Sequence, residues 1–324
     1  MSDFEVIDVH VHLTRSMSEE EKRMIIPGRR RRDRWATPQT AIFHMDLEGI
    51  SKAAVMYLPP LPPRGLILGA KGEKISQPIL TGQNKQESLP TQIGQLLRQF
   101  NQWGCEVEQK FPRLVTFICI APDLGDSKDM VQELVLRVRK GAKGVKLHPG
   151  LFHFFPNDKR LWPIYRQCQE LGLPILADSA PSPGFHILSA WRTPVPKMSF
   201  EYGEPSNFAQ VLENFPHLTL ILAHLGSAYW DERVELAKKF PNVYFDTSQG
   251  FVAPDQIPYN PRRGLAEEDA VRIIRKIGVE RIMFGSDGPA LDREPQLEQL
   301  LRLPLNNREK QMILSKNAKE ILHI

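Results

Sequence analysis

The segment Val6–His12 carries the residues most able to do chemistry, because a short apolar run ends there with His10 and His12. Side chains two residues apart on a β-strand point to the same face. The two imidazoles would therefore project side by side from the end of one strand, at a spacing that suits a shared metal ion. The alternative is a strand with two solvated polar positions, since His-x-His is a short pattern.

Other ionisable side chains follow apolar runs further along the chain. They are Lys146, His148, Asp178, His224 and Asp287. A charged group at the end of a buried strand is unfavourable unless it is paired or bound to a cation. Neutral imidazole together with carboxylate is a ligand set for zinc, iron or manganese. We therefore predict one divalent metal ion at the rim where these strands end, with Zn²⁺ expected and Fe²⁺ or Mn²⁺ as alternatives.

Eight short runs rich in β-branched residues are positioned to present these groups. We expect strands near residues 6–11, 53–58, 114–120, 144–147, 174–177, 218–223, 243–245 and 281–284. Amphipathic stretches between them predict helices at 91–110, 128–139, 159–171, 205–215 and 267–277. Apolar strands that alternate with helices indicate a parallel sheet covered on both faces. Eight such units predict a single α/β domain over residues 1–324, folded as a (β/α)₈ TIM barrel. A doubly wound sheet is disfavoured because no Gly-x-Gly-x-x-Gly follows the first strand.

Long loops are predicted after strands one, two and five, at residues 14–37, from Pro59 onward, and at 179–204. All three leave the C-terminal ends of strands, which is the face where barrel enzymes have their active sites. Loops of this length are commonly lids or binding loops.

Three residues of the loops and strand ends are predicted to contact substrate. Arg32 belongs to a run of five arginines in six residues, which is suited to binding an anion. Phe152 after strand four and Trp191 after strand five would form an aromatic wall. The alternatives are a solvated charge run and aromatic side chains that only anchor the loops.

Composition restricts the class of protein. The chain has 324 residues with 41% hydrophobic content, enough for a large core. Lys and Arg number 42 against 38 Asp and Glu, an excess too small to indicate nucleic-acid binding. No apolar run reaches about 18 residues, so no membrane span is expected. Scattered cysteines without paired spacing favour a reducing compartment. We expect a cytoplasmic protein that acts on a small molecule, with neither nucleic acid nor membrane as a partner.

Several motifs together resemble a known family. They are Ile7–His12, Met45–Ile50, Gly144–Pro149, Ala223–Gly226 and Phe284–Asp287. In this order they resemble the amidohydrolase-related proteins, in the branch of the amidohydrolase superfamily that contains aminocarboxymuconate-semialdehyde decarboxylase. The resemblance covers essentially the whole chain and suggests a homodimer, without indicating an interface.

The resemblance implies roles for individual residues. His10, His12 and Asp287 would be metal ligands, and Asp287 would also accept a proton from bound water. His224 would polarise the substrate or transfer a proton. Family members usually carry a ligating histidine where this chain has Asp178. Because a carboxylate can replace imidazole on zinc, Asp178 is predicted as a further ligand, with a role in the pocket wall as the alternative.

Lys146 and His148 have two interpretations each. In two-metal members of the superfamily a lysine at the position of Lys146 is carboxylated and bridges the metals, whereas relatives in this branch mostly hold one ion. We therefore favour a lysine that forms a salt bridge with Asp178 or Asp287, or that holds a carboxylate of the substrate. His148 is predicted to line the pocket, and a packed core histidine is the alternative.

Two reactions fit these residues. In the leading hypothesis, a metal-dependent hydrolase, activated water attacks an amide, ester or lactone carbon of a small anionic substrate. The alternative is a metal-dependent, non-oxidative decarboxylase (a carboxy-lyase) of an aromatic or unsaturated acid. A third hypothesis is a binding protein that has lost its metal.

Overall fold

The computed structural model describes residues 4–13, 37–57, 89–179, 201–225, 229–248, 265–288 and 293–324. The long loops predicted after the first, second and fifth strands lie almost wholly outside these residues, and so do Arg32 and Trp191.

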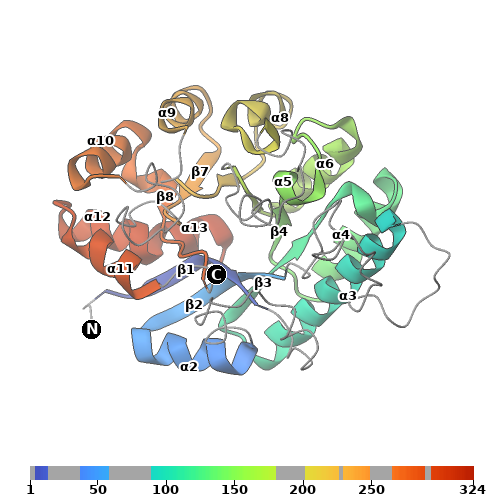
Figure 1. Ribbon diagram of the computed structural model, residues 1–324, viewed down its shortest axis with the longest axis horizontal. Coiled ribbons are helices and arrows are strands. Elements are labelled where there is room, and N and C mark those ends of the chain that lie inside the picture. The colour runs from blue at the N-terminus through green and yellow to red at the C-terminus, as the bar shows by residue number, and fades with distance from the viewer. Residues whose placement is uncertain are drawn as a thin grey trace, which may run out of the picture.

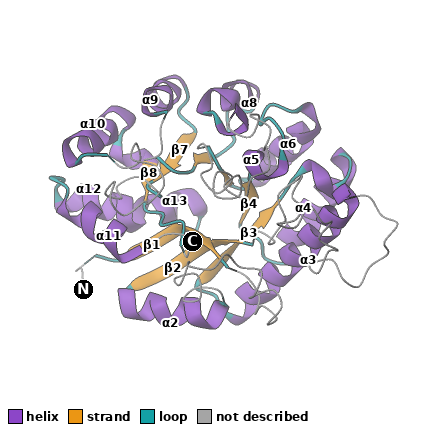
Figure 2. Cartoon of the chain, in the orientation of Figure 1, coloured by secondary structure: helices purple, strands orange, loops and turns teal. Residues whose placement is uncertain are grey.

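Eight parallel strands form one sheet in the order β1 to β8, enclosed by helices (Figures 1 and 2). The strands are β1 (Val6–His12), β2 (Ile50–Met56), β3 (Leu114–Cys119), β4 (Gly144–Leu147), β5 (Ile175–Ala177), β6 (Leu220–Leu222), β7 (Val243–Asp246) and β8 (Ile282–Met283). Each strand pairs with the next in sequence, which is the connectivity of a (β/α)₈ barrel. The predicted fold class is confirmed.

The barrel closes between β1 and the segment that follows β8. Val9 N donates to Phe284 O at 2.9 Å, and Asp287 N donates to His10 O at 2.8 Å. A parallel bridge between Val11 and Gly288 completes the closure. The seam of the barrel therefore runs through residues predicted to bind metal.

Helices surround the strands in the alternation that the sequence predicts. They are α2 (Pro38–Glu48), α3 (Leu89–Lys110), α4 (Ser127–Val138), α5 (Pro149–Phe152), α6 (Trp162–Leu171), α8 (Ala209–Asn214), α9 (Trp230–Lys239), α10 (Glu267–Ile277), α11 (Arg293–Arg302), α12 (Asn307–Gln311) and α13 (Asn317–Leu322). Two predicted helices begin later than expected. The predicted helices at 159–171 and 205–215 each open with a short 3₁₀ turn, at Lys159–Leu161 and Pro205–Phe208. Pro163 explains the first case: proline lacks an amide hydrogen and is tolerated only in the first turn, so α6 starts at Trp162.

Two apolar layers support the barrel. An inner cluster fills its interior and includes Ile7, Val9, Phe117, Leu176 and Met283. A larger outer cluster lies between the strands and the helices. The C-terminal helix α13 contributes to the inner cluster, and its Lys319 pairs with Glu5 just before β1 at 2.5 Å. Helix α13 thus covers the N-terminal end of the barrel and leaves the opposite end for the site. No helix in the described ranges is long and apolar enough to cross a membrane.

The three cysteines, all within the described ranges, are free and buried, which gives a simple test of the packing. Burial raises the pKa of Cys105 to about 11 and also raises the pKa of Cys119 and of Cys168. At pH 8 we expect the native protein to react negligibly with a thiol reagent, because the thiolate is the reactive form. Protein unfolded in denaturant should react with three equivalents of the thiol reagent, one for each cysteine. Fast reaction of one thiol in the native state would show that its packing is wrong.

Candidate metal centre

A β-bulge in β1 places His10 and His12 at the mouth of the barrel. Asp8 pairs with Ala53 and Val11 with Val55, so β1 carries one extra residue. Val9 accordingly belongs to the inner cluster, whereas Val11 belongs to the outer one. The two imidazoles meet with their Nε2 atoms 3.1 Å apart. Simple alternation predicts that the two rings share a face, but it does not predict the bulge.

Asp287 joins these two rings. Its Oδ1 lies 3.1 Å from His12 Nε2 and 3.7 Å from His10 Nε2. Ligand atoms about 2.1 Å from a tetrahedral zinc would be roughly 3.4 Å from one another. The three atoms therefore have the spacing of neighbours in one coordination sphere. The His12 side chain is 23% exposed while that of His10 is fully buried, so this group is reached from the side of His12.

His10 is held as a neutral imidazole whose Nε2 carries the lone pair. Asp246 Oδ2 lies 2.8 Å from His10 Nδ1, and because a carboxylate only accepts, Nδ1 carries the hydrogen. Burial, reinforced by the charge of Lys146, lowers the pKa of His10 to about 3. A carboxylate that fixes the tautomer of a ligating histidine is a common feature of metal sites. The donor set of His10, His12 and Asp287 thus fits a divalent cation.

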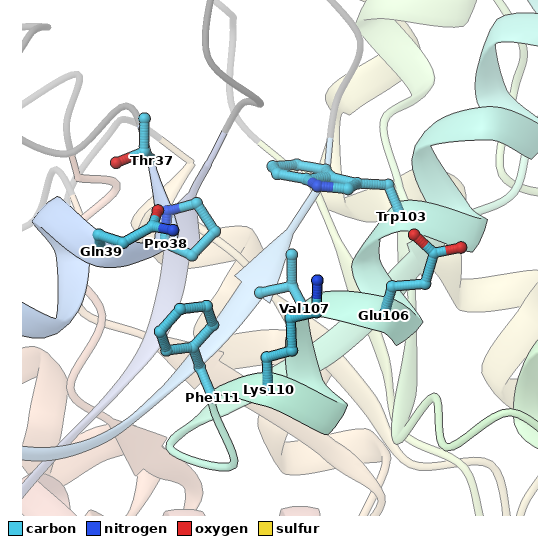
Figure 3. A pocket seen from close by; sticks show the side chains of 8 residues that line it. All are labelled: Thr37, Pro38, Gln39, Trp103, Glu106, Val107, Lys110 and Phe111. Carbon is cyan, nitrogen blue, oxygen red and sulfur yellow. The ribbon is translucent and has the colours of Figure 1, made fainter.

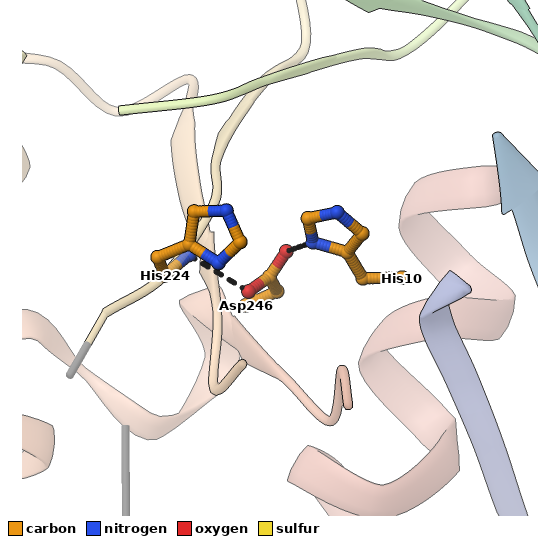
Figure 4. Close-up of side chains that lie close together, drawn as sticks. All are labelled: His10, His224 and Asp246. Atoms are coloured by element: carbon orange, nitrogen blue, oxygen red, sulfur yellow. Dashed lines mark hydrogen bonds and ion pairs between the residues drawn. The ribbon is translucent and has the colours of Figure 1, made fainter. Parts of the chain in front are cut away.

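Asp246, at the end of β7, is a residue that the sequence analysis missed. It accepts from His224 N at 2.9 Å through Oδ1 while its Oδ2 accepts from His10 (Figure 4). His10, His224 and Asp246 also lie close enough to hold an ion. The ring nitrogens concerned already have hydrogen-bond partners, however: His10 Nδ1 contacts Asp246, and His224 Nδ1 contacts Ser248. We therefore interpret this second group as scaffold. The rule used for the other strands, an ionisable residue after an apolar run, would have found Asp246 after Val243–Phe245.

Asp178 lies beside His224 and His148. Its Oδ2 is 2.9 Å from His224 Nε2 and 3.5 Å from His148 Nε2. Burial alone would raise the pKa of Asp178, but the two imidazoles hold it well below its usual range. Burial likewise opposes protonation of His224, yet Asp178 raises the pKa of that imidazole. Asp178 belongs to neither group of metal-capable residues found in the described ranges, and its ligation of metal stays a prediction.

Lys146 and His148 both face this cluster from the end of β4. Lys146 Nζ lies 3.2 Å from His10 Nε2, where it donates to the lone pair that a metal would also use. Burial lowers the pKa of Lys146, and the nearby carboxylates of Asp178, Asp246 and Asp287 oppose that shift. His148 Nδ1 accepts from Leu151 N at 3.3 Å, which leaves the hydrogen on Nε2, facing Asp178. Burial lowers the pKa of His148 to about 4.

Two of the site residues have left-handed backbone conformations. The φ angle is 65° at His224 and 58° at Asp287. For a residue with a side chain this conformation is unfavourable by about 1–2 kcal/mol, and such residues cluster at functional sites. The hydrogen bonds from His224 N to Asp246 and from Asp287 N to His10 O hold them in place.

Asp8, within β1, connects that strand to the segment that follows β8. This buried carboxylate accepts from His10 N at 3.1 Å and from Ser286 Oγ at 2.6 Å, and Arg293 Nε lies 2.7 Å away. Because His10 and Asp287 adjoin these contacts, Asp8 fixes their relative position. Its charge is balanced by Arg293, which is itself buried.

Gly285 allows the segment that follows β8 to approach His10 closely, which leads to a prediction. A Cβ added at this position would lie 3.0 Å from His10 Cβ and 3.1 Å from Asp246 Cβ. We expect Gly285→Ala to weaken metal binding about tenfold by displacing His10 from its partner. A competition titration with a chromogenic chelator measures this.

The control is Gly141→Ala, where a Cβ meets nothing within 4 Å but φ is +109°. That variant should lose about 1 kcal/mol of stability through backbone strain and keep its metal affinity. Equal metal affinity in Gly285→Ala and wild type would contradict the tight approach.

The residues predicted to contact substrate are only partly described. Phe152 lies in α5 and packs in the outer apolar cluster, which is a structural role, and its contact with substrate stays a prediction. Arg32 and Trp191 lie outside the described residues. A separate hollow of about 270 Å³ lies between α2 and α3, on the outside of the barrel (Figure 3). It is lined by Thr37, Pro38, Gln39, Trp103, Glu106, Val107, Lys110 and Phe111, and contains no group of metal-capable residues.

A family model described as amidohydrolase matches residues 84–324, a range that begins after His10 and His12. No curated protein matches the sequence. Among solved structures, the chain is similar to a 2,6-dihydroxybenzoate decarboxylase in complex with 2,6-dihydroxybenzoate (TM-score 0.70, 15% identity, covering 99% of this chain and 100% of that one).

Two further structures are similar over the same extent. One is a dihydroxybenzoic acid decarboxylase from Polaromonas sp. JS666 with bound manganese and the inhibitor 2-nitroresorcinol (TM-score 0.69, 16% identity, 99% and 97% covered). The other is a 5-carboxyvanillate decarboxylase from Sphingomonas paucimobilis (TM-score 0.68, 16% identity, 99% and 100% covered). At these identities the likeness establishes the fold alone.

Proposed function

Because this chain belongs to the amidohydrolase family, we propose that it is a metal-dependent decarboxylase of a small aromatic or unsaturated carboxylic acid. The observation that carries the proposal is the convergence of His10, His12 and Asp287, in a barrel similar along its whole length to decarboxylases. The similarity to decarboxylases leads us to favour decarboxylation over hydrolysis, which was the leading hypothesis of the sequence analysis.

His10 Nε2, His12 Nε2 and Asp287 Oδ1 would hold the cation. When bound, a divalent ion supplies a Lewis acid that polarises a substrate oxygen. Zn²⁺, Fe²⁺ and Mn²⁺ all suit imidazole and carboxylate ligands, and one of the similar structures contains manganese.

The chain's own residues would handle the proton. In decarboxylation the bond between the carboxylate carbon and its neighbour breaks, carbon dioxide leaves, and the remaining carbon takes up a proton. His224 is suited to deliver that proton, because Asp178 raises the pKa of its imidazole against the opposing effect of burial. Asp178 Oδ2 also orients the imidazole through Nε2. Lys146 would hold the departing carboxylate by its positive charge.

Hydrolysis remains a second candidate function because of one observation. Burial would raise the pKa of Asp287, but the hydrogen bond with His12 and the charge of His224 hold it below its usual range. An ionised carboxylate can orient an attacking water by accepting its hydrogen bond, which hydrolysis of an amide, ester or lactone requires.

A substrate panel distinguishes the two reactions. Metal-loaded protein is incubated with hydroxybenzoic and unsaturated acids in one set, and with esters, lactones and amides in the other. We expect carbon dioxide release with stoichiometric formation of the decarboxylated product in the first set. Turnover confined to the second set would overturn the proposal in favour of hydrolysis.

A further inference from the structure

Ser248 is a buried hydroxyl that contacts three groups of the site at once. It follows β7 and is fully buried. Its Oγ lies 2.8 Å from His224 Nδ1 and 3.3 Å from His10 Nδ1, and it donates to Asp246 Oδ1. Its backbone N also donates to Asp246 Oδ1, at 3.0 Å. The sequence analysis assigned no role to this residue.

The directions of these hydrogen bonds follow from the groups involved. Asp246 only accepts, so the single hydroxyl hydrogen of Ser248 points to Asp246 Oδ1. The contact at 2.8 Å must then have His224 Nδ1–H as donor and Ser248 Oγ as acceptor. On the other side of the ring, Asp178 accepts from His224 Nε2–H at 2.9 Å. Both ring nitrogens of His224 therefore carry a hydrogen.

A continuous chain of hydrogen bonds results, running from Asp178 through His224, Ser248 and Asp246 to His10. We infer that Ser248 is a positioning residue, which fixes the ring of His224 and, through Asp246, ties its orientation to that of the metal ligand His10. The inference rests on the proposed function in taking His224 as the group that meets the substrate. The hydrogen-bond chain itself does not depend on which reaction takes place.

A nucleophilic serine is the other reading of Asp178, His224 and Ser248, because the same three residue types form hydrolytic triads. Two observations oppose it. Ser248 is fully buried, and its hydrogen is directed at Asp246 and not at the imidazole that would have to remove it. A fluorophosphonate reagent should therefore leave Ser248 unlabelled, and covalent labelling at Ser248 would overturn the positioning role.

The direct test observes the ring hydrogens of His224 by NMR, in protein labelled with ¹⁵N-histidine. In the wild type we expect two slowly exchanging N–H resonances from His224, identified by their absence in His224→Gln. The Nδ1–H resonance should be lost or broadened in Ser248→Ala and kept in Ser248→Thr, which retains the hydroxyl. A wild-type His224 with hydrogen on Nε2 only would overturn the inference, even if Ser248→Ala does not fold. So would an Nδ1–H resonance that is unchanged in Ser248→Ala.

The matched control is Ser315→Ala. Ser315 is equally buried, and its Oγ contacts only a backbone carbonyl, Gln311 O at 3.4 Å, among the contacts described for it. This variant should keep both resonances of His224. Their loss in Ser315→Ala would show that any buried serine has the same effect, and would overturn a specific role for Ser248.

Kinetics and metal binding give the second readout. Ser248→Ala should lower kcat about 10- to 100-fold, the range for removing a partner of a functional histidine, with KM within twofold of wild type. Ser248→Thr should restore kcat. Metal affinity should be unchanged in both variants, because His10 keeps its bond to Asp246. Metal loss in Ser248→Ala would contradict the assignment.

If no acid is decarboxylated, the proposed function fails, while the NMR result still decides the role of Ser248.

Discussion

Asp287→Asn is expected to lose about 10³-fold or more in kcat/KM, equivalent to roughly 4 kcal/mol of transition-state stabilisation. The substitution keeps the shape of the side chain and removes the charge from the oxygen that faces both His10 Nε2 and His12 Nε2. An amide oxygen is a poorer ligand for a divalent cation in an imidazole site, so metal content should fall as well. The melting temperature of metal-free protein should change little, because Asp287 serves the site and not the apolar core.

A matched control separates this effect from a general change in charge. Asp231 is exposed in the first turn of α9, and Asp231→Asn should leave activity and metal content unchanged. Steady-state kinetics and elemental analysis of both variants provide the comparison. Wild-type turnover by Asp287→Asn would remove Asp287 from the proposed chemistry.

Removal of the metal is expected to abolish activity completely. After dialysis against a strong chelator, turnover should fall to background and return when Mn²⁺ or Zn²⁺ is added. Binding of an ion to the folded state alone also stabilises the protein, by about 2.7 kcal/mol when the free ion is at 100 times its dissociation constant. The metal-free protein should therefore melt at a lower temperature than the loaded protein.

His12→Ala provides the control for that experiment. It removes one of the three ligand atoms, so added metal should neither restore activity nor raise the melting temperature. His217→Ala, at an exposed histidine outside the site, should behave as wild type in both assays. Full activity in protein that elemental analysis shows to be free of metal would refute the metal-dependent mechanism.

The barrel could be predicted from the sequence because its signals are local. Each strand is a short apolar run, and the ionisable groups at their ends mark the mouth. Strand ends were less predictable: the predicted strand 218–223 is β6 (Leu220–Leu222), and β8 spans only Ile282–Met283. Hydrogen bonds to the neighbouring segments determine where each strand begins and ends. These bonds cannot be inferred from the apolar run itself.

The proximity of the three predicted ligands could be predicted from the sequence, but the groups that hold them in place could not. His10, His12 and Asp287 converge as the sequence analysis expected. The bulge in β1 is invisible in the sequence because it depends on the register against β2. Asp246 and Ser248 act through contacts with residues on other strands, and only the folded barrel brings those groups within hydrogen-bonding distance.

The role of Asp178 could not be derived from the resemblance to a family. The family pattern suggests a ligand at this position, whereas the structure shows a carboxylate bonded to His224 and close to His148. A carboxylate at this position has two acceptor oxygens, whereas a neutral imidazole has a single acceptor nitrogen.

Anomalous diffraction from crystals of the metal-loaded protein tests the central claim most directly. Data collected at the absorption edge of manganese or zinc should show one peak within bonding distance of His10 Nε2, His12 Nε2 and Asp287 Oδ1. The same map shows whether Asp178 reaches the ion. A peak bound elsewhere in the protein, or no peak in crystals grown with saturating metal, would contradict the account.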